Sequence, residues 1–313
     1  MKKIQTFLIP FFTPIILILL SSCTSRFYFD FASARKPTSS CTEPANPDSL
    51  KARNVMYWSH EWIASVPYET VTITSYDGLK LYGSLVRKEG STKAVILAHG
   101  YTGCGFDMSE IARVYYEEYG YSVLMCDARA HGRSEGEYIG FGWLDRLDYL
   151  RWIDLLICTL GTDTGIVLHG ISMGGATVLM TAGEKLPSNV KAVISDCAYT
   201  SLYDEVSFVM KKWYRIYDDN LLKKVSLESK EKASYSFEEA SALDQVKKIT
   251  IPVLFIHGED DNFIPLWMVY ALYDACTAEK ELFTVPQAKH ATSSRVDPEN
   301  YRRTVESFLI TLF

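Results

Sequence analysis

Short apolar runs alternate with helical segments along most of this chain, and this pattern constrains its fold more than any other sequence feature. Six runs are rich in Val, Ile and Leu and too brief for helices: 94–98, 121–126, 166–169, 190–195, 253–256 and 282–285. Segments with helical spacing lie between most of them: 108–119, 144–160, 176–186, 266–276 and 301–312. Strand followed by helix, repeated, predicts an α/β fold with a mostly parallel central sheet and helices on both faces.

Two segments depart from this alternation. The runs 71–75 and 79–86 flank a Tyr-Asp-Gly turn signal, which predicts an antiparallel hairpin at the start of the fold. Between residues 198 and 248 the next strand is delayed by an insertion with seven prominent aromatics: Tyr203, Phe208, Trp213, Tyr214, Tyr217, Tyr235 and Phe237. Insertions after the carboxyl ends of parallel strands lie over the active crevice, so we expect a cap here. The alternative for each aromatic is packing within the cap's own helices.

Composition excludes several classes of function. The 313 residues are 48% hydrophobic and carry a net charge of −6, with no stripe of Lys and Arg, so no nucleic-acid partner is expected. No Cys pair has zinc-ligand spacing and no Gly-rich phosphate loop occurs, so we expect no metal and no cofactor. Cys126, Cys158 and Cys197 lie in apolar runs, which predicts buried thiols.

The N-terminus differs from the rest of the chain. Lys2 and Lys3 precede an apolar run over residues 7–20, and small residues precede Cys23. This pattern is typical of a bacterial lipoprotein signal, in which Cys23 would be lipidated. The alternatives are an uncleaved transmembrane helix, for which about 20 apolar residues are needed, and a plain secretory signal.

These features predict three parts of the chain. Residues 1–22 form a signal peptide or membrane anchor, residues 23–50 a linker rich in Pro and Ser, and residues 51–313 the folded domain. We therefore expect a membrane-associated protein, tethered through its N-terminus on the extracytoplasmic side. Oligomeric state is not predicted.

The pentapeptide Gly170-Ile171-Ser172-Met173-Gly174 carries the strongest chemical signal. It follows a short apolar run and precedes a helical pattern, which is the context of a nucleophile elbow. The sharp turn of such an elbow strains the serine backbone and exposes its hydroxyl, and the glycines remove side chains that would clash. We predict that Ser172 is a catalytic nucleophile.

A serine hydroxyl needs a base to take its proton, and the base needs a carboxylate to orient it. In folds with this elbow both follow the serine in chain order, which leaves His257 and His290. His257 ends an apolar run, where a histidine commonly supports a loop. His290 lies beyond the last predicted strand, on a loop able to reach the elbow, and is the predicted base.

The acid is predicted from the loop after the run 253–256. Asp261 lies in this loop, where a buried carboxylate can meet the imidazole. Asp260 is the neighbouring alternative, with a turn or capping role if it is not the acid. Asp196, at the end of another run, is a further alternative acid.

Two backbone N–H groups are expected to form an oxyanion hole. One belongs to Met173, the residue after the nucleophile, and the other to Tyr101, which follows Gly100 in the loop after the run 94–98. Three polar residues near this loop are predicted to support the scaffold: His99, His131 and Arg133.

Taken together, these motifs resemble the α/β-hydrolase superfamily in their order and spacing: His99-Gly100, residues 127–134, Gly170 to Gly174, Asp261 before Ile264-Pro265, and His290. The resemblance covers about residues 71–313, and more narrowly it is to membrane-anchored bacterial hydrolases grouped with esterases, acylglycerol lipases and acyl-CoA thioesterase-like enzymes. It implies the α/β-hydrolase fold and a serine hydrolase that cleaves carboxylic esters of small molecules. Serine rather than aspartate at the elbow departs from the dehalogenase branch.

Three alternatives to an esterase remain open on the sequence. A serine peptidase or amidase and a thioesterase would use the same three residues on the same scaffold. A non-catalytic binding protein on a hydrolase scaffold is the third, although it would have no chemical reason to retain Ser172, Asp261 and His290 together.

Overall fold

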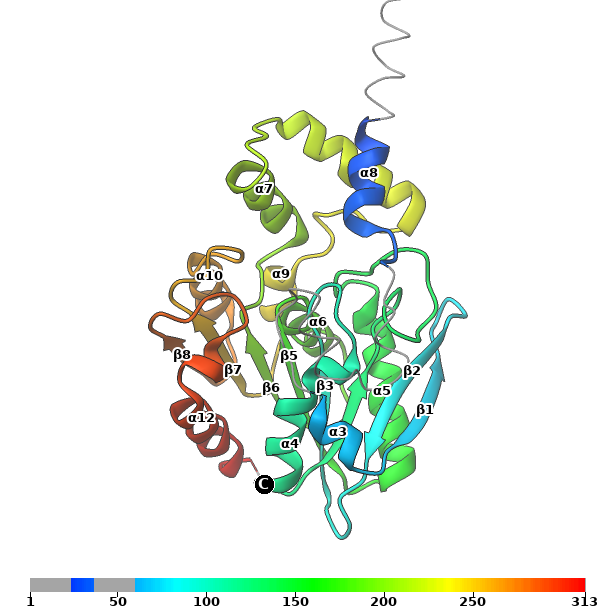
Figure 1. The fold of residues 1–313 in the computed structure, drawn as a ribbon, viewed down its shortest axis with the longest axis vertical. Coiled ribbons are helices and arrows are strands. Elements are labelled where there is room, and N and C mark those ends of the chain that lie inside the picture. The colour runs from blue at the N-terminus through cyan, green and yellow to red at the C-terminus, as the bar shows by residue number, and fades with distance from the viewer. Residues whose placement is uncertain (1–23, 37–59, 313) are drawn as a thin grey trace, which may run out of the picture.

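An eight-stranded sheet forms the centre of the structure, a computed structural model that describes residues 24–36 and 60–312 (Figure 1). Its strand order is β1-β2-β4-β3-β5-β6-β7-β8. The strands are β1 (Glu69–Thr74), β2 (Lys80–Val86), β3 (Lys93–Ala98), β4 (Ser122–Cys126), β5 (Gly165–Ile171), β6 (Val190–Asp196), β7 (Val253–Gly258) and β8 (Lys280–Val285). β1 and β2 pair antiparallel, β2 pairs antiparallel with β4, and all other pairs are parallel. The predicted hairpin and the mostly parallel sheet are confirmed.

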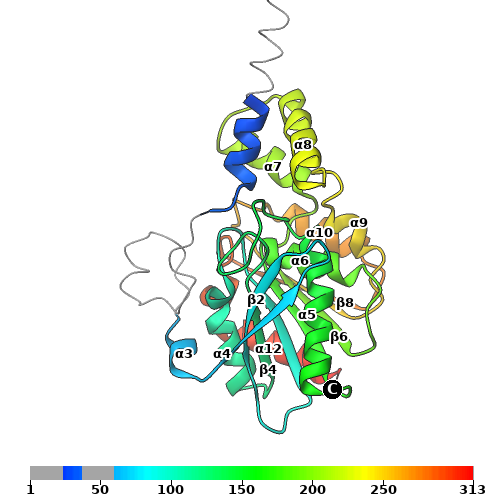
Figure 2. The same ribbon diagram turned by 90° about the vertical axis from the view of Figure 1, so that its right-hand side faces the viewer.

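Helices cover both faces of this sheet (Figures 1 and 2). α5, α6 and α10 contribute buried residues to the core on one face, and α3, α4 and α12 to the core on the other. The bounds of these six helices are α3 (Glu61–Ser65), α4 (Ser109–Glu117), α5 (Asp145–Leu160), α6 (Met173–Ala182), α10 (Trp267–Ala275) and α12 (Pro298–Ile310). Two shorter helices, η1 (Gly105–Met108) and α11 (Ser293–Val296), precede α4 and α12. The five predicted helices are present, with ends shifted by a few residues.

Strand β3 shows why the predicted strands are continuous apolar runs. Ala94, Ile96 and Ala98 belong to the core on one face of the sheet, while Val95 and Leu97 belong to the core on the other. Because side chains alternate between the faces of a strand and both faces are covered, every position must be apolar. Burial on both sides therefore removes the polar alternation that an exposed sheet would show.

The predicted cap consists of α7 (Leu202–Lys212), α8 (Asp219–Ala233) and the short α9 (Ala242–Val246). α7 and α8 project beyond the carboxyl ends of the parallel strands, and α9 packs on α6 (Figures 1 and 2). Side-chain caps define where the two long helices begin. Ser201 accepts a hydrogen bond from the third residue of α7, and Asp218 accepts two from the first turn of α8.

Residues 24–33 form a helix where the sequence predicted the beginning of a linker. We call it the N-terminal helix, and it lies beside α8 (Figure 2). Phe29 is fully buried against the core, and Asp30 forms an ion pair with Lys232 of α8 at 3.1 Å. The linker prediction is therefore wrong for this segment, because its aromatic side chains supply an apolar face that the cap covers.

The predictions for the remaining N-terminal residues fall outside the described part of the chain. They are the signal or anchor over residues 1–22, the lipidation of Cys23 and the linker beyond residue 36. Within residues 24–36 and 60–312, no helix has the length and the apolar character needed to cross a membrane.

The predicted thiol environments are confirmed in two of three cases. Cys126 and Cys197 are buried, whereas Cys158 is exposed. Cys158 lies near the end of α5, whose buried positions include Ile153 and Leu156. A residue two positions after Leu156 lies on the opposite side of a helix, so the apolar run did not indicate which face Cys158 occupies.

Phe29 provides a test of whether the N-terminal helix is part of the folded domain. We expect Phe29→Ala to lower the free energy of unfolding by about 3 kcal/mol, because it removes a buried aromatic ring and leaves a cavity. Phe27 is 64% exposed on the same helix, so Phe27→Ala should change stability by less than about 0.5 kcal/mol. Urea unfolding of the two variants measures both values, and equal effects would contradict the packing of this helix.

Candidate active site

Ser172 lies between β5 and α6 in a conformation that few residues other than glycine adopt. Its φ is 58° and its ψ is −120°, and its N–H donates a hydrogen bond of 2.8 Å to the carbonyl oxygen of Asp196, the last residue of β6. A positive φ at a non-glycine residue costs free energy, so the surrounding packing must hold it in place. The result is a serine at the carboxyl end of a central strand and at the N-terminus of a buried helix.

The two glycines of the pentapeptide allow this turn. A Cβ on Gly170 would lie 2.1 Å from the carbonyl oxygen of Gly174. A Cβ on Gly174 would lie 2.0 Å from the carbonyl oxygen of Ala98, at the end of β3. Both contacts are with backbone atoms that cannot move aside, so the pattern reflects a steric requirement of the packing of α6 against the sheet.

A continuous chain of hydrogen bonds joins Ser172, His290 and Asp261. His290 Nε2 lies 2.9 Å from Ser172 Oγ, and His290 Nδ1 lies 2.8 Å from Asp261 Oδ2. A carboxylate can only accept, so Nδ1 carries the proton and the Nε2 lone pair faces the hydroxyl. The other carboxylate oxygen accepts from the N–H groups of Phe263 and Ile264, both at 2.9 Å. The structure therefore brings together the residues predicted as nucleophile, base and acid.

The alternative residues occupy other places. His257 Nε2 donates to the carbonyl oxygen of Ile264 at 2.9 Å, so it supports the loop that carries Asp261. Asp260 is exposed to solvent. Asp196 is buried, and its carboxylate accepts a hydrogen bond from the Tyr301 hydroxyl at 3.2 Å.

The predicted oxyanion loop lies directly against the nucleophile. A Cβ on Gly100 would lie 3.5 Å from Ser172 Cβ and 3.9 Å from Ser172 Oγ, so the loop backbone passes close to the hydroxyl. In the described part of the chain, the Tyr101 N–H donates to no protein acceptor. Met173 is the first residue of α6, where N–H groups lack partners within the helix.

Two neutral histidines support this loop, which matches the scaffold role predicted for them. His99 Nε2 accepts a hydrogen bond from the Ala128 N–H at 3.0 Å, and His131 Nε2 accepts one from the Thr102 N–H at 3.2 Å. Burial and the neighbouring His99 lower the pKa of His131 to about 3, so its ring stays neutral and can accept. The oxyanion loop is thereby joined to the loop after β4.

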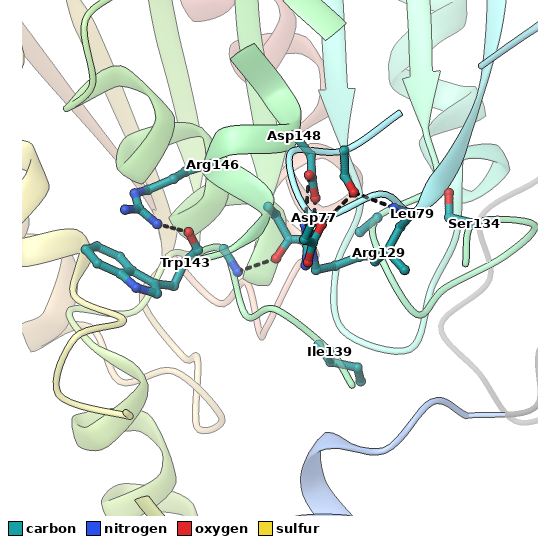
Figure 3. A network of polar contacts seen from close by, with 12 residues as sticks. Asp77, Leu79, Arg129, Ser134, Ile139, Trp143, Arg146 and Asp148 are labelled. Carbon is teal, nitrogen blue, oxygen red and sulfur yellow. Dashed lines mark hydrogen bonds and ion pairs between the residues drawn. The ribbon is translucent and has the colours of Figure 1, made fainter. Parts of the chain in front are cut away.

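Arg129 anchors that second loop to the rest of the domain. Its guanidinium is only 2% exposed and makes two hydrogen bonds of 2.8 Å to the carboxylate of Asp148 in α5 (Figure 3). It also bonds to both carboxylate oxygens of Asp77 in the β1–β2 turn, at 2.8 and 3.2 Å. Arg133, predicted as scaffold, bonds to the buried Asp127 at 2.9 Å. Paired contacts of this kind fix both position and orientation.

The N-terminal helix also contacts the oxyanion loop. The Tyr101 hydroxyl donates to the carbonyl oxygen of Ala32 at 2.6 Å. Arg35, just after this helix, donates to the carbonyl oxygens of Gly132 and Ser134. A segment expected to be a linker therefore connects the cap to two loops next to the nucleophile.

Cys197 was not predicted at the site. Its sulfur, a carboxylate oxygen of Asp261 and a ring nitrogen of His290 all lie within 4.8 Å of one another. Within the described residues this is the one cluster with metal-ligand geometry. His290 already bonds to both Asp261 and Ser172, and burial raises the pKa of the Cys197 thiol well above its usual value. These three side chains are therefore better explained as a buried, protonated thiol behind the triad than as the ligands of a metal ion.

Glu205 is a second residue that the sequence did not indicate. It lies in the first turn of α7, where an acidic residue usually interacts with the helix dipole at the surface. Here the side chain is buried, and within the described part of the chain neither carboxylate oxygen has a hydrogen-bond partner. Burial, and then the charge of Asp261, raise the pKa of Glu205 well above its usual value, which favours the protonated form of this side chain.

Comparisons with known families agree with this geometry. A family model described as alpha/beta hydrolase fold matches residues 93–228, which include the elbow. A second model, described as serine hydrolase (FSH1), matches residues 176–292, which include Asp261 and His290.

Individual relatives extend the similarity over most of the chain. This chain is 29% identical to the uncharacterized protein YqkD of Bacillus subtilis, over 76% of its own length and 77% of the relative. The structure of the esterase Pf2001 of Pyrococcus furiosus superposes with a TM-score of 0.66 at 26% identity, covering 83% of this chain and 96% of that one. A thiohydrolase of Aspergillus aculeatus, aneE, is 32% identical over 42% of this chain and 41% of its own length.

The raised pKa of Asp196 makes the free energy of unfolding depend on pH. Burial raises its pKa to about 7, above the value of about 3.9 in an unfolded chain, so the folded state binds this proton more tightly. The stabilisation is present at low pH and is lost as the pH rises from about 4 to 7. Asn at this position does not titrate. We therefore expect the unfolding free energy of Asp196→Asn, relative to wild type, to increase by about 2 kcal/mol between pH 5 and pH 7. Urea unfolding at both pH values measures it, and a constant difference would contradict the expectation.

Proposed function

The chain is a member of the α/β-hydrolase superfamily, and on this basis we propose that it hydrolyses carboxylic esters through an acyl-enzyme on Ser172. The observation that carries the proposal is the hydrogen-bonded chain Ser172–His290–Asp261, with contacts of 2.9 and 2.8 Å. It places a base within proton-transfer distance of a hydroxyl at an elbow. The serine hydrolase family match is consistent with this chemistry.

Acylation begins with proton transfer from Ser172 Oγ to His290 Nε2 as the oxygen attacks the ester carbonyl carbon. The imidazolium that forms is stabilised by Asp261, which keeps the ring in the correct orientation. Negative charge on the former carbonyl oxygen is stabilised by the N–H groups of Met173 and Tyr101. His290 then gives its proton to the departing alcohol, and the acyl group remains on Ser172.

Deacylation repeats these steps with water as the nucleophile. His290 takes a proton from the water as it attacks the acyl carbon, and then returns that proton to Ser172 Oγ. The carboxylic acid product leaves and the free hydroxyl is restored. The same side chains therefore serve both halves of the reaction, and no further protein group is needed.

Esters are the favoured substrate class because an alcohol leaves more readily than an amine. The esterase activity named for Pf2001, whose fold covers 83% of this chain, supports the same class. A thioester is the second candidate, because aneE, which matches less than half of this chain, is named a thiohydrolase. Amide or peptide cleavage would use the same residues with a poorer leaving group. The cap's aromatic residues suit an apolar acyl or aryl portion of the substrate.

Membrane attachment through the N-terminus is part of this proposal. It is supported by the sequence alone, through Lys2, Lys3, the apolar run over residues 7–20 and Cys23. The attachment, as a lipoprotein or as an anchor, would place the hydrolase domain at the extracytoplasmic face of a membrane.

The substrate class can be tested on the full chain with a short and a long p-nitrophenyl ester, a matched p-nitroanilide and a matched thioester. We expect the ester to have a higher kcat/KM than the anilide, because a phenolate leaves more readily than an aniline. A thioester turned over faster than the ester would favour the thioesterase alternative. Ser172→Ala should abolish ester turnover and labelling by a fluorophosphonate probe. Turnover that survives in Ser172→Ala would overturn the proposal, and failure of folded wild-type protein to label would favour a binding protein.

Two adjacent aspartates provide a matched test of the acid. We expect Asp261→Asn to lower kcat by about 10⁴-fold, because an amide facing Nδ1 favours the wrong tautomer of His290. Asp260→Asn makes the same chemical change at the preceding, exposed residue and should keep activity within about twofold. Steady-state kinetics compares the two variants, and a similar loss in both would contradict the assignment.

A further inference from the structure

The outer face of the N-terminal helix carries two exposed aromatic side chains. Phe27 and Phe31 are 64% and 55% exposed, and their rings stack at 6.3 Å. They are one helical turn apart, on the side opposite Ser25 and Phe29, which are buried against the cap and the core. This short helix therefore presents a pair of aromatic rings to its surroundings.

The tip of the cap exposes further aromatic and aliphatic side chains. Trp213, Tyr214 and Tyr217, between α7 and α8, are 52%, 55% and 68% exposed, and Leu227 in α8 is 68% exposed. α8 lies beside the N-terminal helix, and both project from the sheet at the end opposite the C-terminus (Figures 1 and 2). We call this set the cap-tip surface, and it consists of Phe27, Phe31, Trp213, Tyr214, Tyr217 and Leu227. Exposed apolar side chains that concentrate on the cap and on the helix beside it indicate an interaction site.

The charge of this region differs in sign from that of the chain. Between residues 206 and 233 there are seven Lys and Arg residues against four Asp and Glu, whereas the chain as a whole carries −6. Three of the basic residues directly flank Trp213 and Tyr214: Lys211, Lys212 and Arg215. Asp218 and Asp219 follow Tyr217, and Asp219 pairs with Lys211 at 3.5 Å. Basic residues next to Trp and Tyr are the combination that favours an anionic lipid interface.

The sequence before the N-terminal helix indicates what binds to the cap-tip surface. The apolar run over residues 7–20, preceded by two lysines, ends only a few residues before that helix begins. A bilayer that holds this run, or a lipid attached to Cys23, would therefore lie close to Phe27 and Phe31 along the chain. We propose that the cap-tip surface docks onto the interface of an anionic lipid bilayer. This inference rests on the proposed membrane attachment but not on the proposed ester chemistry.

Docking would bring the site close to the lipid. The N-terminal helix holds the oxyanion loop through the bond from the Tyr101 hydroxyl to Ala32. The cap stands over the carboxyl ends of the strands, where Ser172 is 6% exposed (Figure 1). A surface that rests on the bilayer through the cap and this helix therefore faces it with the same end of the domain that carries the nucleophile.

Trp213 allows a test that separates docking from tethering. The full chain is reconstituted into vesicles of phosphatidylglycerol with brominated acyl chains, which quench only tryptophans that enter the acyl region. The Trp213 contribution is the difference in emission between wild type and Trp213→Phe. Trp267, 50% exposed on α10 outside the cap-tip surface, gives the matched control through Trp267→Phe. Near-UV circular dichroism confirms that each variant is folded.

We expect the Trp213 emission to be quenched in brominated phosphatidylglycerol vesicles. Brominated phosphatidylcholine vesicles should quench it less, and neither lipid should quench the Trp267 emission. The double variant Phe27→Ser, Phe31→Ser should reduce the quenching of Trp213. A tether alone would leave Trp213 in water, so unquenched Trp213 emission in vesicle-bound protein overturns the proposal. Burial of the same surface in a lipid-free dimer, detected by sedimentation and abolished by the double variant, would also overturn it.

Discussion

The close backbone approach around Ser172 is the constraint on which the rest of the site depends. Gly170 and Gly174 let α6 start within contact distance of β3 and β5, and the Asp196 carbonyl holds the serine N–H. The strained φ of 58° costs on the order of 1–3 kcal/mol. All ten residues of α6 are buried, and the apolar contacts of this helix offset that cost. The strained conformation therefore persists because it lies beside a fully buried helix.

The environments of the histidines explain why one of them is suited to act as a base. His99, His131, His169 and His257 have ring nitrogens bonded to backbone groups or tyrosine hydroxyls, and each is at most 1% exposed. His290 is different, because one nitrogen faces a carboxylate and the other faces a serine hydroxyl. The buried histidines hold neighbouring loops through hydrogen bonds, whereas the histidine on a loop beyond β8 can exchange a proton with a bound molecule.

The N-terminal helix gives the domain a feature that a minimal hydrolase scaffold does not need. One face is buried by the cap, its last carbonyls bond to the Tyr101 hydroxyl and the 137–139 loop, and its other face is aromatic and exposed. The cap, the oxyanion loop and the N-terminal segment are thus linked through about a dozen residues. A change in the surroundings of this helix would act directly on the elements that cover Ser172.

The sequence by itself determined the strand and helix order, the elbow at Ser172, and the choice of His290 and Asp261, because these depend on local pattern and chain order. It also located the insertion that forms the cap. It did not indicate the N-terminal helix, the exposure of Cys158, or the positions of Cys197 and Glu205. Those depend on which segments meet in space. Phe29 contacts the Tyr138 ring and Lys232 of α8, which are more than 100 residues away in the sequence. The pKa of Glu205 is raised because folding buries it near Asp261. Local pattern specifies an element and its inward face, but only tertiary packing decides what that face contacts and what charge a buried group carries.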